Sequence, residues 1–332
     1  MSVLNDKTIL ITGGTGSFGN KITEIILREY EPHSIRILSR GELLQMQMRE
    51  KFKNERKLRF LIGDVRDRDR VYRAMNNVDI VIHAAAMKQV PACEYNPLEA
   101  VRTNIDGAAN IIDSAIDNKV EKVIVVSSDK AVHPVNLYGA TKMVAEKLFT
   151  QANVFVPENG TPKFSCVRYG NVVGSRGSVV PVFMDQRESG TFTITDPRMT
   201  RFWITLEQGA RFVIRSIENM VGGEIFIPKI PSMEVIDLAK VIGPSCKSVV
   251  TGIRPGEKLH EVLITEDESR HTLEFNDHFI IEPEFPFWTT NWRPENGGKR
   301  PAEGFRYSSS GNSDWISKSD LIKMLKHEGY DI

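Results

Sequence analysis

Cysteine is scarce in this sequence, and long apolar runs are missing from it. The 332 residues include three cysteines, Cys93, Cys166 and Cys246, which are odd in number, widely spaced and without a metal-like pair. We therefore expect a reduced, cytoplasmic protein. The apolar run that follows Asp6 and Lys7 ends in Thr-Gly-Gly, and it is too short for a signal peptide or a membrane span.

A net charge of one sign is also lacking, because 43 basic side chains balance 43 acidic ones. This balance argues against a protein that binds nucleic acid or a membrane surface over a wide area, but it leaves room for a local basic pocket that binds a phosphorylated ligand. His260-Glu261 matches half of a zinc motif. No histidine follows at the spacing that the motif requires, so we expect no metal.

Short β-rich segments alternate with segments of helical periodicity in the first half of the chain. The β-rich segments are apolar on both faces, which predicts a parallel sheet covered by helices on both sides. We expect a Rossmann-type, doubly wound α/β domain over residues 1–174 with a return strand near 222–230, and a smaller mixed α/β substrate-binding lobe and tail over 175–332. The predicted strands are Thr8–Thr12, Ile35–Ser39, Leu58–Ile62, Asp79–Ala85, Lys122–Ser127 and Phe164–Arg168, and the predicted helices include Leu98–Asn118, Tyr138–Ala152, 233–243 and Lys318–His327.

A glycine cluster separates the first predicted strand from the first predicted helix. Gly14-x-Gly16-x-x-Gly19 fits the dinucleotide-binding fingerprint. Gly13-x-x-Gly16-x-x-Gly19 fits the short-chain-dehydrogenase variant of that fingerprint. Glycines permit the tight turn and let the backbone approach a pyrophosphate, which then lies at the positive end of the helix. The predicted cofactor contacts in this loop are Gly13, Thr15, Gly16, Ser17, Phe18 and Gly19.

The end of the second predicted strand indicates which dinucleotide binds. Enzymes that use NAD usually have an acidic residue there, which binds the ribose 2′-hydroxyl. This chain has Ser39-Arg40 instead, and a hydroxyl with a guanidinium suits a 2′-phosphate, so NADP is favoured over NAD. Asp64-Val65 is placed to meet the adenine, and Ala84 is small enough for the cofactor to lie against it.

A tyrosine and a lysine follow the fifth predicted strand. Tyr138 and Lys142 are spaced i, i+4, so they share one face of the predicted helix. A lysine ammonium favours the phenolate form of a neighbouring tyrosine and can also hydrogen-bond the nicotinamide ribose. Ser128, at the end of the preceding strand, can share the proton of a substrate hydroxyl. These three residues predict hydride transfer from a secondary alcohol.

With these motifs in place, the chain resembles the extended short-chain dehydrogenase/reductase family, and within it the C5-inverting UDP-N-acetylglucosamine 4,6-dehydratases. The resemblance implies a lyase that binds and recycles NADP, acts on UDP-N-acetylglucosamine and forms a homo-oligomer, a hexamer built from dimers. It also implies the first step of pseudaminic acid synthesis, which serves flagellin glycosylation. The motifs, within roughly residues 7 to 283, are "ITGGTGSFG", "GDVRDRDR", "HAAAMKQVP", "SSDKAVHPVNLYGATK", "RYGNVVGSRGSVVP", "RMTRFWIT", "GGEIFIPKIPSM" and "GIRPGEKLHE".

The resemblance also gives roles to a neighbouring acid and amine. Tyr138 would take the proton from the sugar O4, Lys130 would remove the C5 proton, and Asp129 would protonate the departing 6-hydroxyl. A lysine that acts as a base must be neutral, so we expect burial and nearby lysines to lower the pKa of Lys130 and the pKa of Asp129 to be raised. Neighbouring residues on a regular strand face opposite sides. For Asp129 and Lys130 to act together, the strand that precedes them must therefore end at Ser128.

The remaining predicted contacts come mainly from the resemblance. Lys88 and Asn104 are expected beside the cofactor, and guanidinium groups suit the substrate diphosphate because they donate two parallel hydrogen bonds. The predicted substrate contacts are Lys88, Asn171, Arg176, Arg198, Arg201 and Arg254. Two alternatives stay open: a nucleotide-sugar 4-epimerase, which needs Tyr138 and Lys142 but no acid–base pair for dehydration, and a non-catalytic NADP-binding sensor.

Overall fold

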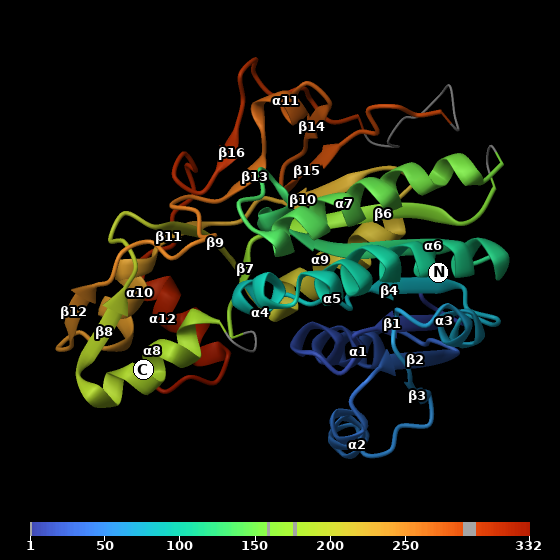
Figure 1. Cartoon of the computed structure of the whole chain (residues 1–332), viewed down its shortest axis with the longest axis horizontal. Coiled ribbons are helices and arrows are strands. Elements are labelled where there is room, and N and C mark those ends of the chain that lie inside the picture. Colours follow the sequence, from blue (N-terminus) through green and yellow to red (C-terminus); the bar gives the residue numbers. More distant parts are fainter. Residues whose placement is uncertain (1, 158–159, 175–177, 288–296) are drawn as a thin grey trace.

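A computed structural model describes residues 2–157, 160–174, 178–287 and 297–332. Figure 1 shows a large sheet lined by helices, with a smaller lobe beside it that contains β8, β12, α8, α10 and α12. The predicted α/β class is confirmed. The predicted division between residues 174 and 175 stays a prediction, and four later elements, α9, β10, β14 and β15, lie with the large sheet.

The large sheet has nine strands in the order β14-β15-β10-β6-β5-β4-β1-β2-β3. In this order, all strands from β10 to β3 are parallel to one another. β15 is antiparallel to β10, and β14 is antiparallel to β15. All of β1 is buried, as expected where helices cover both faces of a parallel sheet. The strands are β1 (Thr8–Thr12), β2 (Ser34–Ser39), β3 (Leu58–Ile62), β4 (Ile80–His83), β5 (Lys122–Ser128), β6 (Lys163–Tyr169), β10 (Ile225–Pro228), β14 (Thr272–Glu274) and β15 (His278–Ile281).

The helices of the sheet domain pack in two groups. α1 packs against α9, while α6 packs against α3 and α7. Their apolar residues recur at helical spacing, as Ile22, Ile25 and Ile26 do on α1, and this places each apolar face in the core. The helices are α1 (Ser17–Glu29), α2 (Glu42–Lys51), α3 (Arg68–Ala74), α4 (Val90–Tyr95), α5 (Pro97–Val101), α6 (Gly107–Asp117), α7 (Leu137–Gln151), α9 (Leu206–Asn219) and α11 (Glu266–Ser269).

One predicted helix is interrupted in the structure. The sequence predicts a single helix over Leu98–Asn118, whereas α5 and α6 are separated by a π-helical turn over Arg102–Asp106. Such a turn admits an extra residue, and π-helical turns occur often at functional sites. Here the turn buries Asn104 and Thr103, and Thr103 lines the candidate site.

The smaller lobe has its own apolar core. Phe183, Phe192 and Leu238 belong to this core, which is separate from that of the large sheet. Its elements are β7 (Asn171–Val172), α8 (Val179–Ser189), β8 (Thr191–Ile194), β9 (Thr200–Ile204), β11 (Ser232–Glu234), α10 (Val235–Ile242), β12 (Lys247–Val250) and α12 (Lys318–His327). No helix in the described ranges is both long and apolar enough to cross a membrane.

The segment after Glu284, for which the sequence suggests no role, returns to the middle of the molecule. β16 (Tyr307–Ser308) pairs with β13 (Val262–Ile264). The next residue, Ser309, is fully buried, and its hydroxyl accepts a hydrogen bond from the backbone N–H of Glu261 at 2.9 Å. The segment therefore supports the loop that carries Glu261.

Candidate active site

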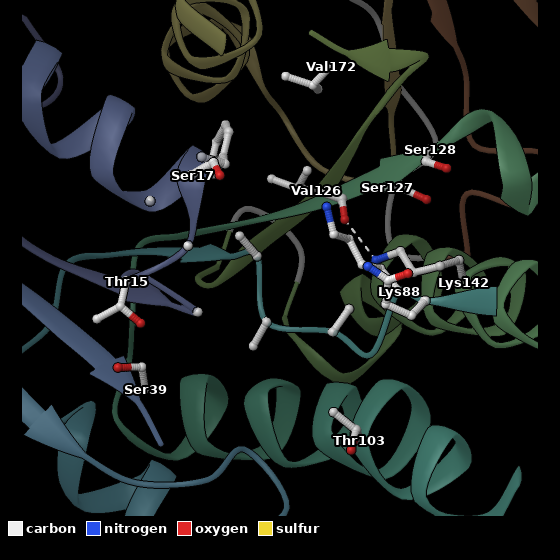
Figure 2. A pocket seen from close by; sticks show the side chains of 18 of the residues that line it. Thr15, Ser17, Ser39, Lys88, Thr103, Val126, Ser127, Ser128, Lys142 and Val172 are labelled. Atoms are coloured by element: carbon white, nitrogen blue, oxygen red, sulfur yellow. Dashed lines mark hydrogen bonds between the residues drawn. The ribbon is translucent and has the colours of Figure 1, made fainter. Parts of the chain in front are cut away.

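A cavity of about 780 Å³ lies at the carboxyl ends of the parallel strands. Ligands of doubly wound sheets bind at this edge, where neighbouring strand ends diverge. Figure 2 shows Thr15 and Ser39 in one part of the cavity, Lys88 and Lys142 together in another, and Ser128 near the end of β5. Predicted residues that line it are Gly13, Thr15, Gly16, Ser17, Phe18, Gly19, Ser39, Arg40, Asp64, Val65, Ala84, Lys88, Ser128, Asp129, Lys130, Tyr138, Lys142 and Asn171.

The glycine loop between β1 and α1 has the shape that a pyrophosphate site requires. Gly13 adopts a φ of +65°, and a Cβ there would lie 2.9 Å from the Cα of Ala85. A Cβ on Gly19 would lie 2.3 Å from the carbonyl oxygen of Gly14. α1 begins after Gly16 without a side-chain cap, so the N–H groups of its first turn face the cavity lining. The loop fits a dinucleotide.

The end of β2 carries a hydroxyl and a guanidinium. Ser39 and Arg40 both line the cavity, and the Arg40 side chain is 61% exposed. Arg40 Nη1 lies 3.7 Å from Asp64 Oδ2, so the guanidinium is held near the end of β3. The Ser39 hydroxyl accepts a hydrogen bond from the Gln45 side-chain amide, which leaves its own proton available to a ligand. A hydroxyl and a guanidinium therefore lie together at this end of the cavity.

The catalytic turn, Ser128 to Ala131, follows β5 directly. β5 ends at Ser128, and Asp129–Ala131 form a short 3-10 turn, so the predicted strand end is confirmed. The Ser128 hydroxyl accepts a hydrogen bond from the backbone N–H of Lys130 at 3.0 Å and donates one to Asp129 Oδ1 at 3.2 Å. A Cβ on Gly139 would lie 2.3 Å from the Lys130 carbonyl oxygen, so α7 packs directly on this turn.

Asp129 and Lys130 form an ion pair with a buried carboxylate and a lysine side chain that is 27% exposed. Lys130 Nζ lies 3.0 Å from Asp129 Oδ1, and the Asp129 side chain is 1% exposed. Asp129 Oδ2 is buried and has no hydrogen-bond partner within the described part of the chain. Burial raises the pKa of Asp129, although the Lys130 ammonium opposes that effect. A carboxyl with a raised pKa suits a general acid.

The pKa of Lys130 is shifted in the direction opposite to our expectation. Burial alone would lower it, but Asp129 and Glu261 stabilise the ammonium and raise the pKa above its ordinary value. The sequence could not indicate Glu261, which is 131 residues away and 3.4 Å from Lys130 Nζ. Lys130 must therefore lose its proton, for which Asp129 is the nearest acceptor, before it can act as a base.

Tyr138 and Lys142 both face the cavity from α7. Burial raises the pKa of Tyr138 to about 12, while the Lys130 ammonium and the Ser128 hydroxyl oppose the shift. Lys142 Nζ donates a hydrogen bond to the Val126 carbonyl oxygen at 2.7 Å (Figure 2), and burial lowers the pKa of Lys142. In this structure the cation that acts on the phenol is thus Lys130, whereas the sequence indicates Lys142.

Asn104 is not in the cavity lining but supports it. Its side-chain oxygen accepts a hydrogen bond from the Met87 backbone N–H at 2.8 Å, and its amide donates to the Met87 carbonyl at 3.0 Å and to Thr141 Oγ1 at 2.9 Å. These bonds fix the segment that carries Lys88. Burial and the Lys130 ammonium lower the pKa of Lys88.

Of the predicted substrate arginines that the structure describes, Arg198, Arg201 and Arg254 are not among the residues that line the cavity. Arg198 is 71% exposed and pairs with Asp196, and Arg254 is exposed. Arg201 donates hydrogen bonds to three backbone carbonyls, those of Thr200, Lys258 and Leu259. Among the predicted arginines, Arg176 lies outside the described residues. Their contact with substrate stays a prediction.

The sequence does not point to three polar residues of this region. Thr103 and Ser127 line the cavity, and their buried hydroxyl oxygens have no hydrogen-bond partner within the described ranges. Thr103 could have been found only through the π-helical turn, which periodicity conceals. Glu261, in the sequence that matches half of a zinc motif, reaches Lys130 across the fold.

Comparison with known proteins gives consistent results. A family model described as "Polysaccharide biosynthesis protein" matches residues 9–283. The "UDP-N-acetylglucosamine 4,6-dehydratase (inverting)" of Campylobacter jejuni is 50% identical over 99% of this chain and 100% of its own length. The "UDP-glucose 4-epimerase" of Rickettsia canadensis is 44% identical over 83% of each chain. The X-ray structure of Pen from Bacillus thuringiensis, 42% identical, superposes with a TM-score of 0.89 over 98% of this chain and 99% of that one.

Proposed function

We propose that this chain, which belongs to the family of polysaccharide biosynthesis proteins, catalyses the C5-inverting 4,6-dehydration of UDP-N-acetylglucosamine. The product would be UDP-2-acetamido-2,6-dideoxy-β-L-arabino-hexos-4-ulose. The observation that carries the proposal is the Asp129–Lys130 ion pair, with its buried carboxylate, beside Tyr138 in one cavity. Removal of water across C5 and C6 requires a base and an acid on adjacent atoms, and this pair supplies both.

The proposal gives each of these side chains a role. Tyr138 accepts the proton of the sugar 4-hydroxyl. The 4-ketone makes the C5 proton acidic, and Lys130 removes it once its own proton has passed to Asp129. Asp129 then donates that proton to the departing 6-hydroxyl, so water leaves. The hydride taken from C4 in the oxidation would return to C6, and C5 is reprotonated from the opposite face, which inverts it.

The glycine loop and the end of β2 indicate the cofactor. A bound nicotinamide dinucleotide would supply the hydride acceptor and donor that the reaction needs. The loop residues fit its pyrophosphate, and Ser39 and Arg40 support NADP over NAD, because a guanidinium can pair with a 2′-phosphate. Cytoplasmic localisation, assembly into a homohexamer and a place at the start of pseudaminic acid synthesis belong to the same proposal.

A 4-epimerase is the second candidate, because relatives that are 44% identical carry that name. An epimerase oxidises C4 and reduces it again on the other face. It has no use for a general acid next to a base at C5 and C6, yet Asp129 is buried with a raised pKa at that place. The cavity therefore favours dehydration.

Proton NMR of the purified protein with UDP-N-acetylglucosamine in deuterated water tests the proposal. We expect a new 6-methyl signal, deuterium at C5 and L-arabino couplings, with no cofactor added. A galacto-configured product that keeps its 6-hydroxyl would support the epimerase instead. D-xylo couplings would keep dehydration but contradict the role given to Lys130 in inversion.

Replacing Arg40 with alanine tests the cofactor assignment. A guanidinium–phosphate contact contributes roughly 1.5–3 kcal/mol, so we expect R40A to weaken NADP binding about 10- to 100-fold while NAD binding stays nearly unchanged. Calorimetric titration with both dinucleotides measures the difference. R73A removes an exposed arginine from α3 and should alter neither affinity. An equal loss for both dinucleotides would show that Arg40 does not read the 2′-phosphate.

A further inference from the structure

Glu261 is a buried carboxylate that the proposed reaction does not use. Its side chain is 3% exposed. Glu261 Oε1 lies 3.4 Å from Lys130 Nζ and 3.8 Å from Arg201 Nε, and Oε2 lies 3.4 Å from Lys258 Nζ. Burying an ionised carboxylate costs several kcal/mol unless cations compensate, so the three cations explain why this one stays charged.

Two of the three cations are fixed by the backbone, whereas Lys130 is held by carboxylates. Lys258 Nζ donates hydrogen bonds to the carbonyl oxygens of Asp129 and Val132 at 3.1 and 2.6 Å. Arg201 donates to three carbonyls. The Lys130 amine instead donates to the carboxylates of Asp129 and Glu261. The Lys130 amine therefore gains or loses a proton while it lies between two carboxylates.

The two acids behave differently. Burial raises the pKa of Asp129, which suits proton exchange, whereas the pKa of Glu261 is lowered because Lys130, Arg201 and Lys258 together outweigh its burial. When Asp129 is protonated as a general acid, it is no longer an anionic partner for Lys130. Glu261 is then the carboxylate that remains charged beside the amine.

We propose that Glu261 is a positioning residue for the dehydration: its carboxylate keeps the Lys130 amine in place while Asp129 is neutral, and stabilises the positive charge that forms on Lys130 as the C5 proton arrives. This inference rests on the proposed function. No bond of the substrate is made or broken by Glu261, and the proton passes from C5 to Lys130 as already described. A fixed charge aimed at a developing charge lowers a barrier without reorganising.

The segment after Glu284 contributes to this arrangement. Ser309 holds the backbone N–H of Glu261, and its hydroxyl also lies 2.6 Å from Thr200 Oγ1. Thr200 Oγ1 in turn lies 2.9 Å from His260 Nδ1. Because the backbone N–H of Glu261 and the side chain of the preceding residue, His260, are both tied in this way, the Glu261 carboxylate has little freedom to follow Lys130. The charged and titratable groups around Lys130 are Asp129, Glu261, Lys258, Arg201, Lys88 and Tyr138.

Substitution of Glu261 with glutamine removes the charge and keeps the shape. With UDP-N-acetylglucosamine deuterated at C5, we expect E261Q to lower kcat about 10- to 100-fold, to leave KM within about twofold, and to increase the isotope effect on kcat, because C5 proton removal becomes the slow step. E261D, which keeps a carboxylate, should recover part of kcat. E266Q, an exposed glutamate on α11, is the matched control and should behave as wild type.

A second measurement needs no turnover. Acetic anhydride acetylates neutral amines, so competitive labelling of the protein without substrate, read by mass spectrometry of the Lys130 peptide, reports the protonation of Lys130. Loss of the Glu261 charge lowers the pKa of Lys130 in E261Q. A pKa lower by one enlarges the neutral fraction about tenfold at fixed pH, so labelling should rise in E261Q but not in E266Q.

The outcomes separate the two proposals. If wild type forms no 6-methyl product, the proposed function is wrong. If wild type is active but E261Q shows wild-type labelling of Lys130 and an unchanged isotope effect, the role of Glu261 is wrong even if E261Q is slower. Thermal unfolding of E261Q and E261D, compared with wild type, identifies a loss that comes from misfolding, which E261D would then share.

Discussion

Asp129→Asn is expected to lower the rate of 6-methyl formation by about 10²- to 10⁴-fold, the usual contribution of general acid catalysis. Asparagine fills nearly the same volume but cannot give a proton to the departing hydroxyl. Loss of the Asp129 charge also removes a cause of the raised pKa of Lys130, and this amine, whose side chain is 27% exposed, can then lose its proton to water, so C5 of the sugar should continue to exchange with solvent. In deuterated water, UDP-N-acetylglucosamine recovered from D129N should therefore carry deuterium at C5 without loss of water, which mass spectrometry measures.

Comparison with a Lys130→Met variant separates the acid from the base. K130M lacks the amine that takes the C5 proton, so neither exchange nor water loss is expected from it. Asp267→Asn, which changes a carboxylate that is 85% exposed, serves as the matched control for D129N. Exchange in K130M at the wild-type rate would assign the base to another residue, and Lys88, whose pKa is lowered, would be the first to test.

Tyr138→Phe should slow C4 oxidation, and with it every step that follows. The phenol is the group placed to accept the proton of the 4-hydroxyl, and without the 4-ketone the C5 proton is not acidic. We expect a fall of about 10²- to 10⁴-fold in both C5 exchange and product formation, measured in the same deuterium experiment. This result differs from that of D129N, in which exchange persists.

The control for Y138F is a tyrosine of the same size outside the cavity. Tyr72 lies on α3 and is 43% exposed, so Y72F should keep wild-type rates. Y138F should also bind UDP-N-acetylglucosamine with nearly unchanged affinity, because the hydroxyl is one contact among many. Persistent C5 exchange in Y138F would contradict the role of the phenol as the base for O4.

Local patterns explain why many of the predicted residues lie around one cavity. The glycine loop lies within one strand–turn–helix unit, and Asp129, Tyr138 and Lys142 follow β5 on the next turn and the next helix, so their proximity needs no knowledge of distant chain segments. The end of β5 at Ser128 could also be derived, since only an irregular turn lets Asp129 and Lys130 face the same cavity.

Long-range contacts account for most of what the sequence does not show. The raised pKa of Lys130 depends on Glu261, and periodicity gives no sign that a loop 131 residues away comes within 3.4 Å of the amine. The arginines assigned to substrate stay a prediction for a related reason. An exposed charge has no pattern that tells a ligand contact from a solvated surface, so the resemblance alone points to Arg198 and Arg254, which lie away from the cavity lining.

The pairing of β16 with β13 has a consequence for synthesis of the protein. Strands β1 to β6 pair along the first half of the chain, whereas Ser309 meets Thr200 and Glu261 across separations of 109 and 48 residues. Closing such loops costs entropy that local contacts do not, and chains fold from the N-terminus as they leave the ribosome. A nascent chain can therefore build its dinucleotide-binding half early, yet it acquires the anchored Glu261 only after Ser309 has emerged. Mutations around Ser309 should therefore slow the final stage of folding more readily than they change the reaction in the folded protein.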